Sequence, residues 1–376
     1  MPRPVIVVDD AIAHSEAALG PLGELHRAPA AELPSLLGRV RPDALIVRSV
    51  TQINAALLDR APSVRFVGTA TAGTDHLDLA ELAAREITTA SAAGCNAQAV
   101  AEWVVTALEL AQARLSPQLR AGPIGVVGFG NVGARTTRLL RALGREVLVS
   151  DPPLARAGGC AEPLLEFEAL WRRCSIVSFH VPLIEDGHDQ TWGYVDAHTP
   201  APAGPKLIIN TSRGAVVRDA ALDRADIHAA ILDVWDHEPH LNVARLHDLK
   251  LLFASPHVAG YSLEGKIAAT RMMHEAVCAW LGRTPSWTGA ELLPIRPLDP
   301  TLTSIARTLA AVVDLEGDDA RTRALARLPS SERAAAFEEL RRHYVLRREF
   351  RAWAVAAAHP QREWLLRAGF SRSGLV

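Results

Sequence analysis

Three charged residues of different types each follow an apolar run that is typical of a buried strand. They are Arg213, Glu238 and His257. A guanidinium binds a carboxylate through two parallel hydrogen bonds, and an imidazole takes up a hydroxyl proton near neutral pH. A carboxylate beside that imidazole selects its tautomer and stabilises its protonated form. The trio therefore predicts removal of a hydride from a 2-hydroxy acid, with His237 and His240 as competing candidates for the base.

A glycine-rich turn lies upstream of these residues, in the sequence GVVGFGNVG at positions 125–133. The first glycine of a Gly-x-Gly-x-x-Gly turn permits the tight bend, the second admits a pyrophosphate, and the third lets the helix pack closely. An acid about twenty residues later accepts hydrogen bonds from the ribose of NAD and repels the extra phosphate of NADP. We therefore predict an NAD site that includes Gly128, Gly130, Asn131, Val132, Gly133 and Asp151.

The elements that must position these residues alternate between short apolar runs and segments of helical period. We predict long helices over 97–115, 132–143 and 263–281. This alternation favours an α/β fold with two doubly wound, parallel-sheet (Rossmann-like) domains. The predicted strands are Val5–Val8, Ala44–Val47, Phe66–Thr69, Ile124–Val127, Val147–Val149, Ile176–Phe179, Leu207–Ile209, Ala230–Leu232 and Leu251–Phe253.

The chain of 376 residues is long enough for two or three domains. We expect a substrate-binding domain over 1–95, completed by about 258–285, and an NAD-binding domain over 96–257. The proline-rich stretch 285–300 is predicted to be a linker. Residues 286–376 are rich in arginine and helical in period, and we expect a small α+β domain that forms a homodimer.

Composition argues against several other classes of protein. Lys plus Arg number 40 and Asp plus Glu number 42, so no bulk charge attracts nucleic acid or a membrane surface. No apolar run is long enough to predict a membrane span. The four cysteines lack metal-ligand spacing, and the histidines lack the spacing of zinc enzymes, so we predict no metal. Cysteines of this kind indicate a cytoplasmic protein.

Longer motifs carry a family resemblance. Besides the glycine turn they are NTSRG at 210–214, DVWDHEP at 233–239 and PHVAG at 256–260. With these motifs, residues 1–285 resemble the D-isomer-specific 2-hydroxyacid dehydrogenases. Further matches at 47–51, 68–76 and 260–266, and at 341–349 in the C-terminal part, extend the resemblance to nearly the whole chain.

The resemblance implies a bacterial, cytoplasmic, NAD-dependent enzyme that acts as a homodimer on a small phosphorylated hydroxy acid. It implies that Arg213 and Glu238 are the active-site Arg and Glu, and that His257 is the proton donor or acceptor. Two further sets of residues are implied to line the substrate and cofactor sites. The substrate set is Ser49, Thr71 and Tyr261, and the cofactor set adds Thr211, Ser212, Arg213, Asp233 and Gly260.

Some points depart from the family or stay open. Val181 occupies a cofactor-site position where similar sequences carry threonine, and 221–230 is short for the helix expected there. The substrate's phosphate needs a cation, for which Arg48 is one candidate and Arg347 or Arg348, reaching across a dimer, another. Two alternatives remain: a dehydrogenase of another phosphohydroxy acid such as 3-phosphoglycerate, and a non-catalytic NAD-sensing binding protein.

Overall fold

The computed structural model describes residues 3–373, and the chain divides into two compact units. The first unit runs to Asn96 and is completed by Ser262–Pro294. The second unit consists of Ala97–Tyr261 together with the chain from Ile295 onward. The C-terminal segment that we predicted as a separate domain is therefore packed into the same unit as the glycine turn.

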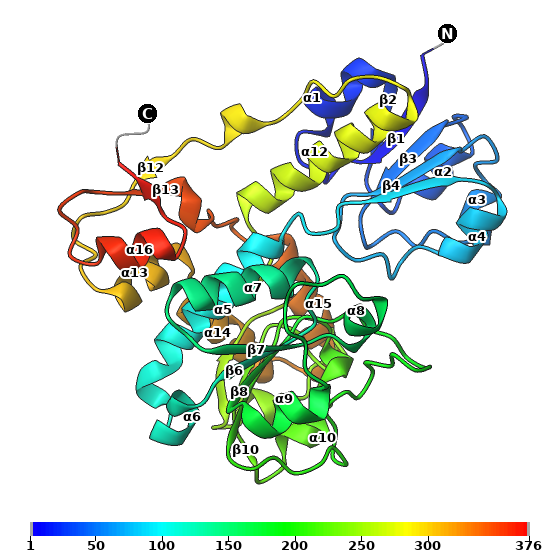
Figure 1. Cartoon of the computed structure of the whole chain (residues 1–376). Coiled ribbons are helices and arrows are strands. Elements are labelled where there is room, and N and C mark those ends of the chain that lie inside the picture. The colour runs from blue at the N-terminus through cyan, green and yellow to red at the C-terminus, as the bar shows by residue number, and fades with distance from the viewer. Residues whose placement is uncertain (1–2, 374–376) are drawn as a thin grey trace. The chain divides into compact units, whose positions relative to one another are not determined.

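The first unit is a five-stranded parallel sheet in the order β2-β1-β3-β4-β5, with helices on both faces. One face packs against α1 and α12, where Met273 and Val277 are fully buried, and α2, α3 and α4 cover the other. Figure 1 shows α12 beside the N-terminal strands, although it comes from residues far later in the chain. The strands are Val5–Asp9, Glu24–Ala28, Ala44–Val47, Phe66–Thr69 and Thr88–Ser91, and the helices are Ser15–Leu19, Leu33–Leu37, Ala55–Leu58, Leu79–Ala84 and Leu263–Trp280 (α12).

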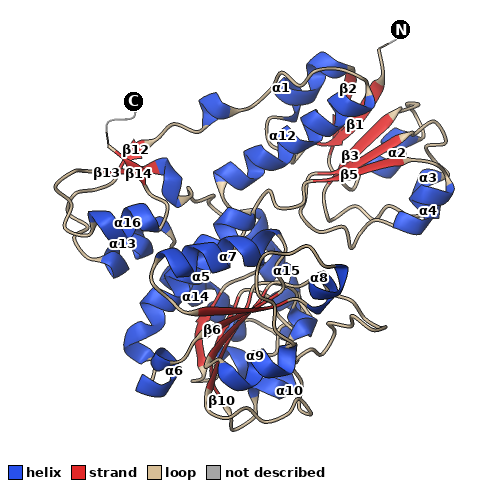
Figure 2. Cartoon of the chain, in the orientation of Figure 1, coloured by secondary structure: helices blue, strands red, loops and turns tan. Residues whose placement is uncertain are grey.

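The second unit contains a six-stranded parallel sheet in the order β11-β10-β9-β8-β6-β7. Helices cover both of its faces, as Figure 2 shows in blue around the red strands. The strands β6 to β11 are Ile124–Val127, Val147–Ser150, Ile176–Phe179, Lys206–Asn210, Ile227–Leu232 and Leu251–Ala254. The helices are α5 (Ala97–Ala111), α6 (Pro117–Ala121), α7 (Asn131–Ala142), α8 (Pro152–Ala157), α9 (Phe167–Arg173), α10 (Asp219–Leu222) and α11 (Val243–Leu246).

The remainder of the second unit is α+β, as predicted. It holds a three-stranded parallel sheet in the order β12-β13-β14. The stretch predicted as a linker contains the first of these strands. The strands are Arg296–Pro297, Trp353–Val355 and Ser371–Arg372, and the helices α13 to α16 are Ile305–Val312, Leu315–Ala324, Ser330–Arg342 and Arg362–Arg367.

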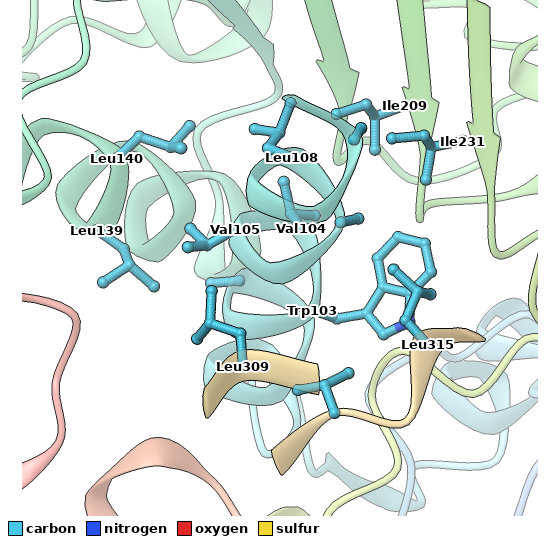
Figure 3. Packing of buried hydrophobic residues seen from close by; sticks show 14 of the residues in the cluster. Trp103, Val104, Val105, Leu108, Leu139, Leu140, Ile209, Ile231, Leu309 and Leu315 are labelled. Atoms are coloured by element: carbon cyan, nitrogen blue, oxygen red, sulfur yellow. The ribbon is translucent and has the colours of Figure 1, made fainter. Parts of the chain in front are cut away.

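Helix α5 is the centre of the largest core of this unit. Its side chains Val104, Val105 and Leu108 lie in a single cluster with α7, with β9 and β10, and with α13 and α14 of the C-terminal segment (Figure 3). Because burial of each such side chain stabilises the fold by about 1.5–3 kcal/mol, this shared core holds the C-terminal segment on the sheet.

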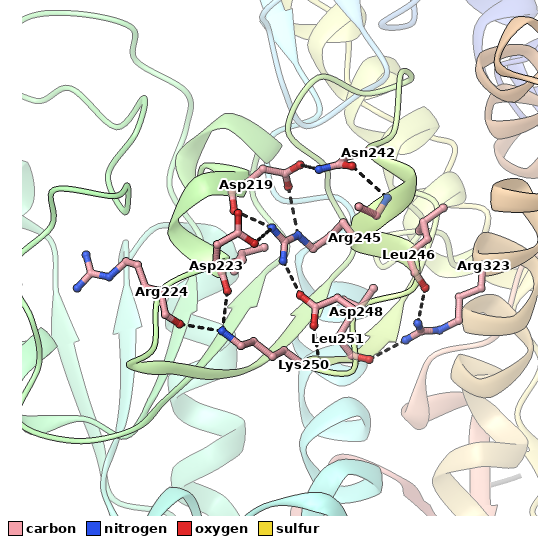
Figure 4. A network of polar contacts seen from close by, with 12 residues as sticks. Asp219, Asp223, Arg224, Asn242, Arg245, Leu246, Asp248, Lys250, Leu251 and Arg323 are labelled. Atoms are coloured by element: carbon pink, nitrogen blue, oxygen red, sulfur yellow. Dashed lines mark hydrogen bonds and ion pairs between the residues drawn. The ribbon is translucent and has the colours of Figure 1, made fainter.

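A polar network secures the short segment at 219–230. Arg245 is buried, and its guanidinium donates to the Asp219 carbonyl at 2.9 Å, to Asp223 Oδ1 at 2.8 Å and to Asp248 Oδ2 at 2.5 Å (Figure 4). The helix that similar proteins led us to expect here is thus reduced to α10, and Arg245 satisfies the polar groups around it.

Candidate active site

The residues predicted to do chemistry come from three adjacent strands whose carboxyl ends are aligned. Asn210 at the end of β9 pairs with Leu232 at the end of β10, and Leu232 pairs with Ala254 at the end of β11. Neighbouring strands lie about 4.8 Å apart, so the loops that follow them share one edge of the sheet. Arg213, Glu238 and His257 are carried by these three loops.

Glu238 and His257 are in direct contact. Nδ1 of His257 lies 2.6 Å from Oε1 of Glu238, and Oε2 of Glu238 accepts a hydrogen bond from the Trp235 amide at 3.2 Å. Burial alone would raise the pKa of Glu238, but His257, the Trp235 amide and Arg341 together lower it. Glu238 is therefore held as an anion, and it fixes the proton of His257 on Nδ1, which leaves Nε2 as the nitrogen that can accept a proton.

The loop that carries His257 is fixed by Asp233. Oδ1 of Asp233 accepts hydrogen bonds from Ser255 Oγ at 2.6 Å, from the Val258 amide at 2.7 Å and from the Ala259 amide at 3.0 Å. The Asp233 carbonyl also accepts from the His257 amide at 2.7 Å. His257 has a left-handed backbone with φ of 60°, a conformation that a histidine keeps only when its surroundings enforce it.

The competing histidines are placed differently. His237 and His240 are exposed, and Nε2 of His237 lies 3.6 Å from Asp236 rather than at Glu238. The Glu238 carboxylate is thus engaged by His257, and this geometry favours His257 as the base.

Arg213 lies on the loop after β9, and this loop packs tightly against the loop after β10. A Cβ atom on Gly214 would lie 1.7 Å from the Trp235 carbonyl oxygen, so only glycine permits this approach. The side-chain amide of Asn210 donates to the Arg213 carbonyl at 2.9 Å, and Arg213 Nη1 donates to the Ser212 carbonyl at 2.9 Å. The Arg213 segment is therefore held next to the segment that carries Glu238.

The glycine turn has the geometry that a dinucleotide requires. Gly128 has a φ of 88°, and a Cβ on Gly133 would lie 1.8 Å from the Gly128 carbonyl oxygen. Gly130, in contrast, has no atom within 4 Å of a Cβ position, and Asn131 and Val132 open α7 beside that free space. The turn thus fits the pyrophosphate of NAD, with the amides at the start of α7 directed toward it.

Asp151 lies at the end of β7 with its carboxylate already oriented. Oδ2 accepts from the Phe129 amide at 2.7 Å, and Oδ1 accepts from the Leu154 amide at 3.0 Å. A carboxylate has about four acceptor positions, so two remain for ribose hydroxyls. Val181 lies against the same turn: a Cβ atom built on Gly128 would be 2.9 Å from Val181 Cγ1.

Sequence reasoning missed His180 at the end of β8. Its Nδ1 lies 3.1 Å from Thr211 Oγ1 and its Nε2 lies 3.0 Å from Ser178 Oγ, and removal from solvent lowers the pKa of His180 to about 3. The ring is neutral and holds Thr211, a predicted cofactor residue. Its position directly after a predicted strand was a usable signal, the same one that identified His257.

The predicted substrate residues of the N-terminal part lie in the first unit. Thr71 Oγ1 lies 2.7 Å from Thr69 Oγ1 and donates to the Gly73 carbonyl at 3.1 Å. Ser49 is exposed and Arg48 is half-buried, both just after β3. Their roles stay predictions.

Arg347 and Arg348 are both buried. Arg347 donates to the carbonyl of Ala99 and lies 3.3 Å from Glu102 Oε2, inside its own unit. The guanidinium of Arg347 is therefore engaged in the core around α5, and the prediction that Arg347 or Arg348 reaches across a dimer stays a prediction. The side chain of Arg348 also does not extend into solvent.

Two further features of the described part of the chain concern metals and membranes. Residues 3–373 contain no group of three or more His, Cys, Asp or Glu side chains arranged to hold a metal ion. No helix within these residues combines the length and apolarity of a membrane span.

Comparison with solved structures shows the fold. An NADPH-dependent glyoxylate/hydroxypyruvate reductase from Sinorhizobium meliloti, in complex with NADP and malonate, matches with a TM-score of 0.62 and 24% identity over 74% of this chain and 94% of that one. A D-lactate dehydrogenase from Aquifex aeolicus, complexed with NAD and lactic acid, matches with a TM-score of 0.57 and 20% identity over 74% of this chain and 95% of that one.

Comparison of sequences shows the family. Residues 87–259 match the NAD binding domain of the D-isomer specific 2-hydroxyacid dehydrogenases, and residues 296–369 match a domain of unknown function. The erythronate-4-phosphate dehydrogenase of Edwardsiella ictaluri is 41% identical over 93% of this chain and 94% of that protein. That of Salinibacter ruber is 39% identical over 95% of this chain and 96% of that protein. With these relatives, and with its own dinucleotide turn and Glu–His pair at the strand ends, the chain belongs to the erythronate-4-phosphate dehydrogenase family of D-isomer specific 2-hydroxyacid dehydrogenases.

Proposed function

We propose that this protein oxidises 4-phospho-D-erythronate to 2-oxo-3-hydroxy-4-phosphobutanoate with NAD as the hydride acceptor, a step toward pyridoxal 5'-phosphate. The observation that carries the proposal is the 2.6 Å contact between Glu238 and His257 at the aligned ends of β10 and β11. The names of the relatives supply the substrate, and the matched NAD binding domain supplies the cofactor.

Three residues of the protein have separate roles in this oxidation. Arg213 binds the substrate carboxylate in a forked pair of hydrogen bonds and thereby orients the C2 carbon. NAD, which the glycine turn and Asp151 would hold, would supply the acceptor for the hydride of C2. His257 Nε2 accepts the proton of the C2 hydroxyl. Glu238 stabilises the imidazolium that results, and His257 then releases the proton to solvent. General base catalysis of this kind contributes about 10²–10⁴ in rate.

The remaining assignments are also proposals. We assign substrate binding to the first unit through Ser49, Thr71 and Arg48, and to Tyr261. We assign homodimer formation to residues 286–376, which light scattering of the purified protein will test. Because NAD and a phosphorylated acid are charged molecules that do not cross membranes unaided, we place the reaction in the cytoplasm.

A substrate panel tests the proposed function. Purified protein with NAD is given 4-phospho-D-erythronate, D-3-phosphoglycerate or D-lactate, and NADH absorbance is followed. We expect the fastest oxidation with 4-phospho-D-erythronate. Faster oxidation of either other acid refutes the substrate assignment, and NADH binding with no turnover of any of them indicates an NAD-sensing protein instead.

A variant pair tests the base. His257→Asn is expected to lose turnover by orders of magnitude and to keep its affinity for NADH, whereas the exposed His240→Asn stays at the wild-type rate. Activity that survives in His257→Asn would move the role of base to another residue.

A further inference from the structure

The C-terminal helix α15 reaches the loop that follows the catalytic histidine. Tyr344, just beyond α15, packs its ring edge-to-face against Tyr261, with ring centroids 5.7 Å apart and planes at 82°. The hydroxyl of Tyr344 donates to Asp318 Oδ2 on α14 at 3.1 Å, which anchors the contact. Tyr261 comes four residues after His257, so the end of α15 forms part of the surroundings of the catalytic pair.

Arg341 is the cation that α15 brings to this place. Burial works to lower the pKa of its guanidinium, but interaction with Tyr261 and with the carboxylates of Glu338 and Glu238 raises it, so the side chain stays cationic. The influence is mutual, because Arg341 also helps to lower the pKa of Glu238. A fixed positive charge therefore lies within electrostatic range of the Glu238–His257 pair.

The guanidinium of Arg341 is only partly used by the protein. Nη1 donates to Glu338 Oε1 at 2.9 Å and to Oε2 at 3.2 Å. Within residues 3–373, Nε is buried and has no acceptor, and no hydrogen bond involves Nη2. Nε and Nη2 form the edge of the guanidinium that grips an anion with two parallel bonds. A buried donor without an acceptor destabilises the folded protein, and a bound anion would supply the missing acceptor.

The neighbouring arginines differ from Arg341. Nη1 and Nη2 of Arg347 are committed to Glu102 and to the carbonyls of Ala99 and Ala259 in the core, although its Nε, like that of Arg341, has no acceptor among the described residues. Arg342 is exposed and pairs with Glu339. Arg341 alone of these three combines partial exposure, 22% of its side chain, with proximity to Glu238.

We propose that the guanidinium of Arg341 binds the phosphate group at the far end of the substrate and so selects a phosphorylated hydroxy acid over an unphosphorylated one. The inference rests on the proposed function, since it names the partner of the substrate's second anionic group. The carboxylate goes to Arg213 and the C2 hydroxyl to His257, so the phosphate, two carbons further along the chain, needs a cation beside this pair. A planar guanidinium suits a phosphate because two of its oxygens accept at once.

The test compares two substrates that differ only in the phosphate, 4-phospho-D-erythronate and D-erythronate. Arg341→Gln is expected to lower kcat/KM for the phosphorylated acid about 10²-fold, the loss of a charge-assisted hydrogen-bonded pair. The loss of kcat/KM for D-erythronate should be at least about tenfold smaller, because only the phosphorylated acid carries the second anion. Arg341→Lys, which keeps the charge but not the fork, should recover part of the loss.

Arg342→Gln is the matched control, because it makes the same change one residue along the same helix at an exposed position. It should leave both substrates at wild-type values. Competitive inhibition by inorganic phosphate supplies a second readout. We expect phosphate to compete with the substrate of the wild type, and to compete about tenfold more weakly in Arg341→Lys. This variant keeps a long cationic side chain on α15, so it can be measured even if Arg341→Gln does not fold.

The outcomes separate cleanly. A parallel loss with both substrates means that Arg341 only supports the Glu238–His257 geometry, and it overturns the proposal. The ratio of kcat/KM for 4-phospho-D-erythronate to that for D-erythronate gives a second outcome. If this ratio changes in Arg48→Gln but not in Arg341→Gln, the phosphate is assigned to Arg48 and the proposal is overturned as well. A wild type that oxidises D-erythronate as fast as the phosphorylated acid refutes the proposed function itself, a result that no Arg341 variant is needed to detect.

Discussion

The contact between Glu238 and His257 makes a quantitative prediction for Glu238→Gln. Glutamine keeps the shape of the side chain and its acceptor oxygen but removes the charge. When Nε2 takes the substrate proton, the imidazolium and the carboxylate have charge centres about 4 Å apart, and at an effective dielectric constant of about 20 they attract by about 4 kcal/mol. The side chains are 28% and 24% exposed, so solvent reduces this to about 2–3 kcal/mol.

A barrier raised by this amount lowers kcat about 10²-fold, since each 1.4 kcal/mol, roughly, is tenfold in rate. The measurement is NADH formation from saturating 4-phospho-D-erythronate, with NADH affinity measured by fluorescence and expected to be unchanged. Because Glu238 acts through His257, Glu238→Gln should cost nothing further in a protein that already carries His257→Asn.

Two results would refute this reasoning. One is a kcat in Glu238→Gln within about threefold of the wild type, which would show that the charge is not used in the transition state. The other is a double variant whose loss equals the product of the two single losses, which would show that the residues act independently.

The glycine turn, the polar network and a buried acid provide further predictions. Gly130→Ala should leave the melting temperature unchanged, because nothing lies within 4 Å of its Cβ position. It should nevertheless weaken NADH binding at least about tenfold. Gly133→Ala, whose Cβ would lie 1.8 Å from a carbonyl oxygen, should lose both stability and NADH binding. Arg245→Ala should lower the free energy of unfolding in urea by about 3–5 kcal/mol, against at most about 0.5 kcal/mol for the exposed ion pair of Arg172, and equal effects would contradict the network. Burial raises the pKa of the Asp318 carboxyl from 3.8 to about 6, so the folded protein binds this proton more tightly than the unfolded chain does. The contribution of Asp318 to the free energy of unfolding therefore falls by about 3 kcal/mol as the pH rises from about 4 to 6. Urea titrations of Asp318→Asn should lack that decline, and an unchanged pH dependence would refute the assignment.

The sequence was sufficient to predict the three interior strands of the first sheet and all six strands of the second. All nine predicted strands are present, because a parallel strand buried on both faces has a nearly continuous apolar sequence. The strands that were missed in the first sheet are Glu24–Ala28 and Thr88–Ser91, which form its two edges. Their side chains are mostly polar or partly exposed, so they carry no apolar run.

The catalytic candidates were predictable for a related reason. Each follows a strand that could be recognised, and parallel strands end at the same side of a sheet. Arg341 had no such signal, since it lies on a helix about eighty residues beyond His257, and the segment after that helix meets the loop of His257 only through the packing of Tyr344 on Tyr261. The packing of the C-terminal segment on the sheet also could not be predicted, because a helical, arginine-rich sequence does not indicate which surface it covers.

That attachment has a consequence for any attempt to shorten the protein. β11 is the outermost strand of its sheet, and α14 shields it: Asp319 accepts from the Ala254 amide at 2.8 Å, and Arg323 donates to the carbonyls of Leu246 and Leu251 at 2.6 Å. A truncation before Ile295 would uncover these backbone groups together with the apolar side chains above them. Such a bare edge recruits strands from other molecules, so the excised dehydrogenase core should precipitate rather than persist as a minimal enzyme.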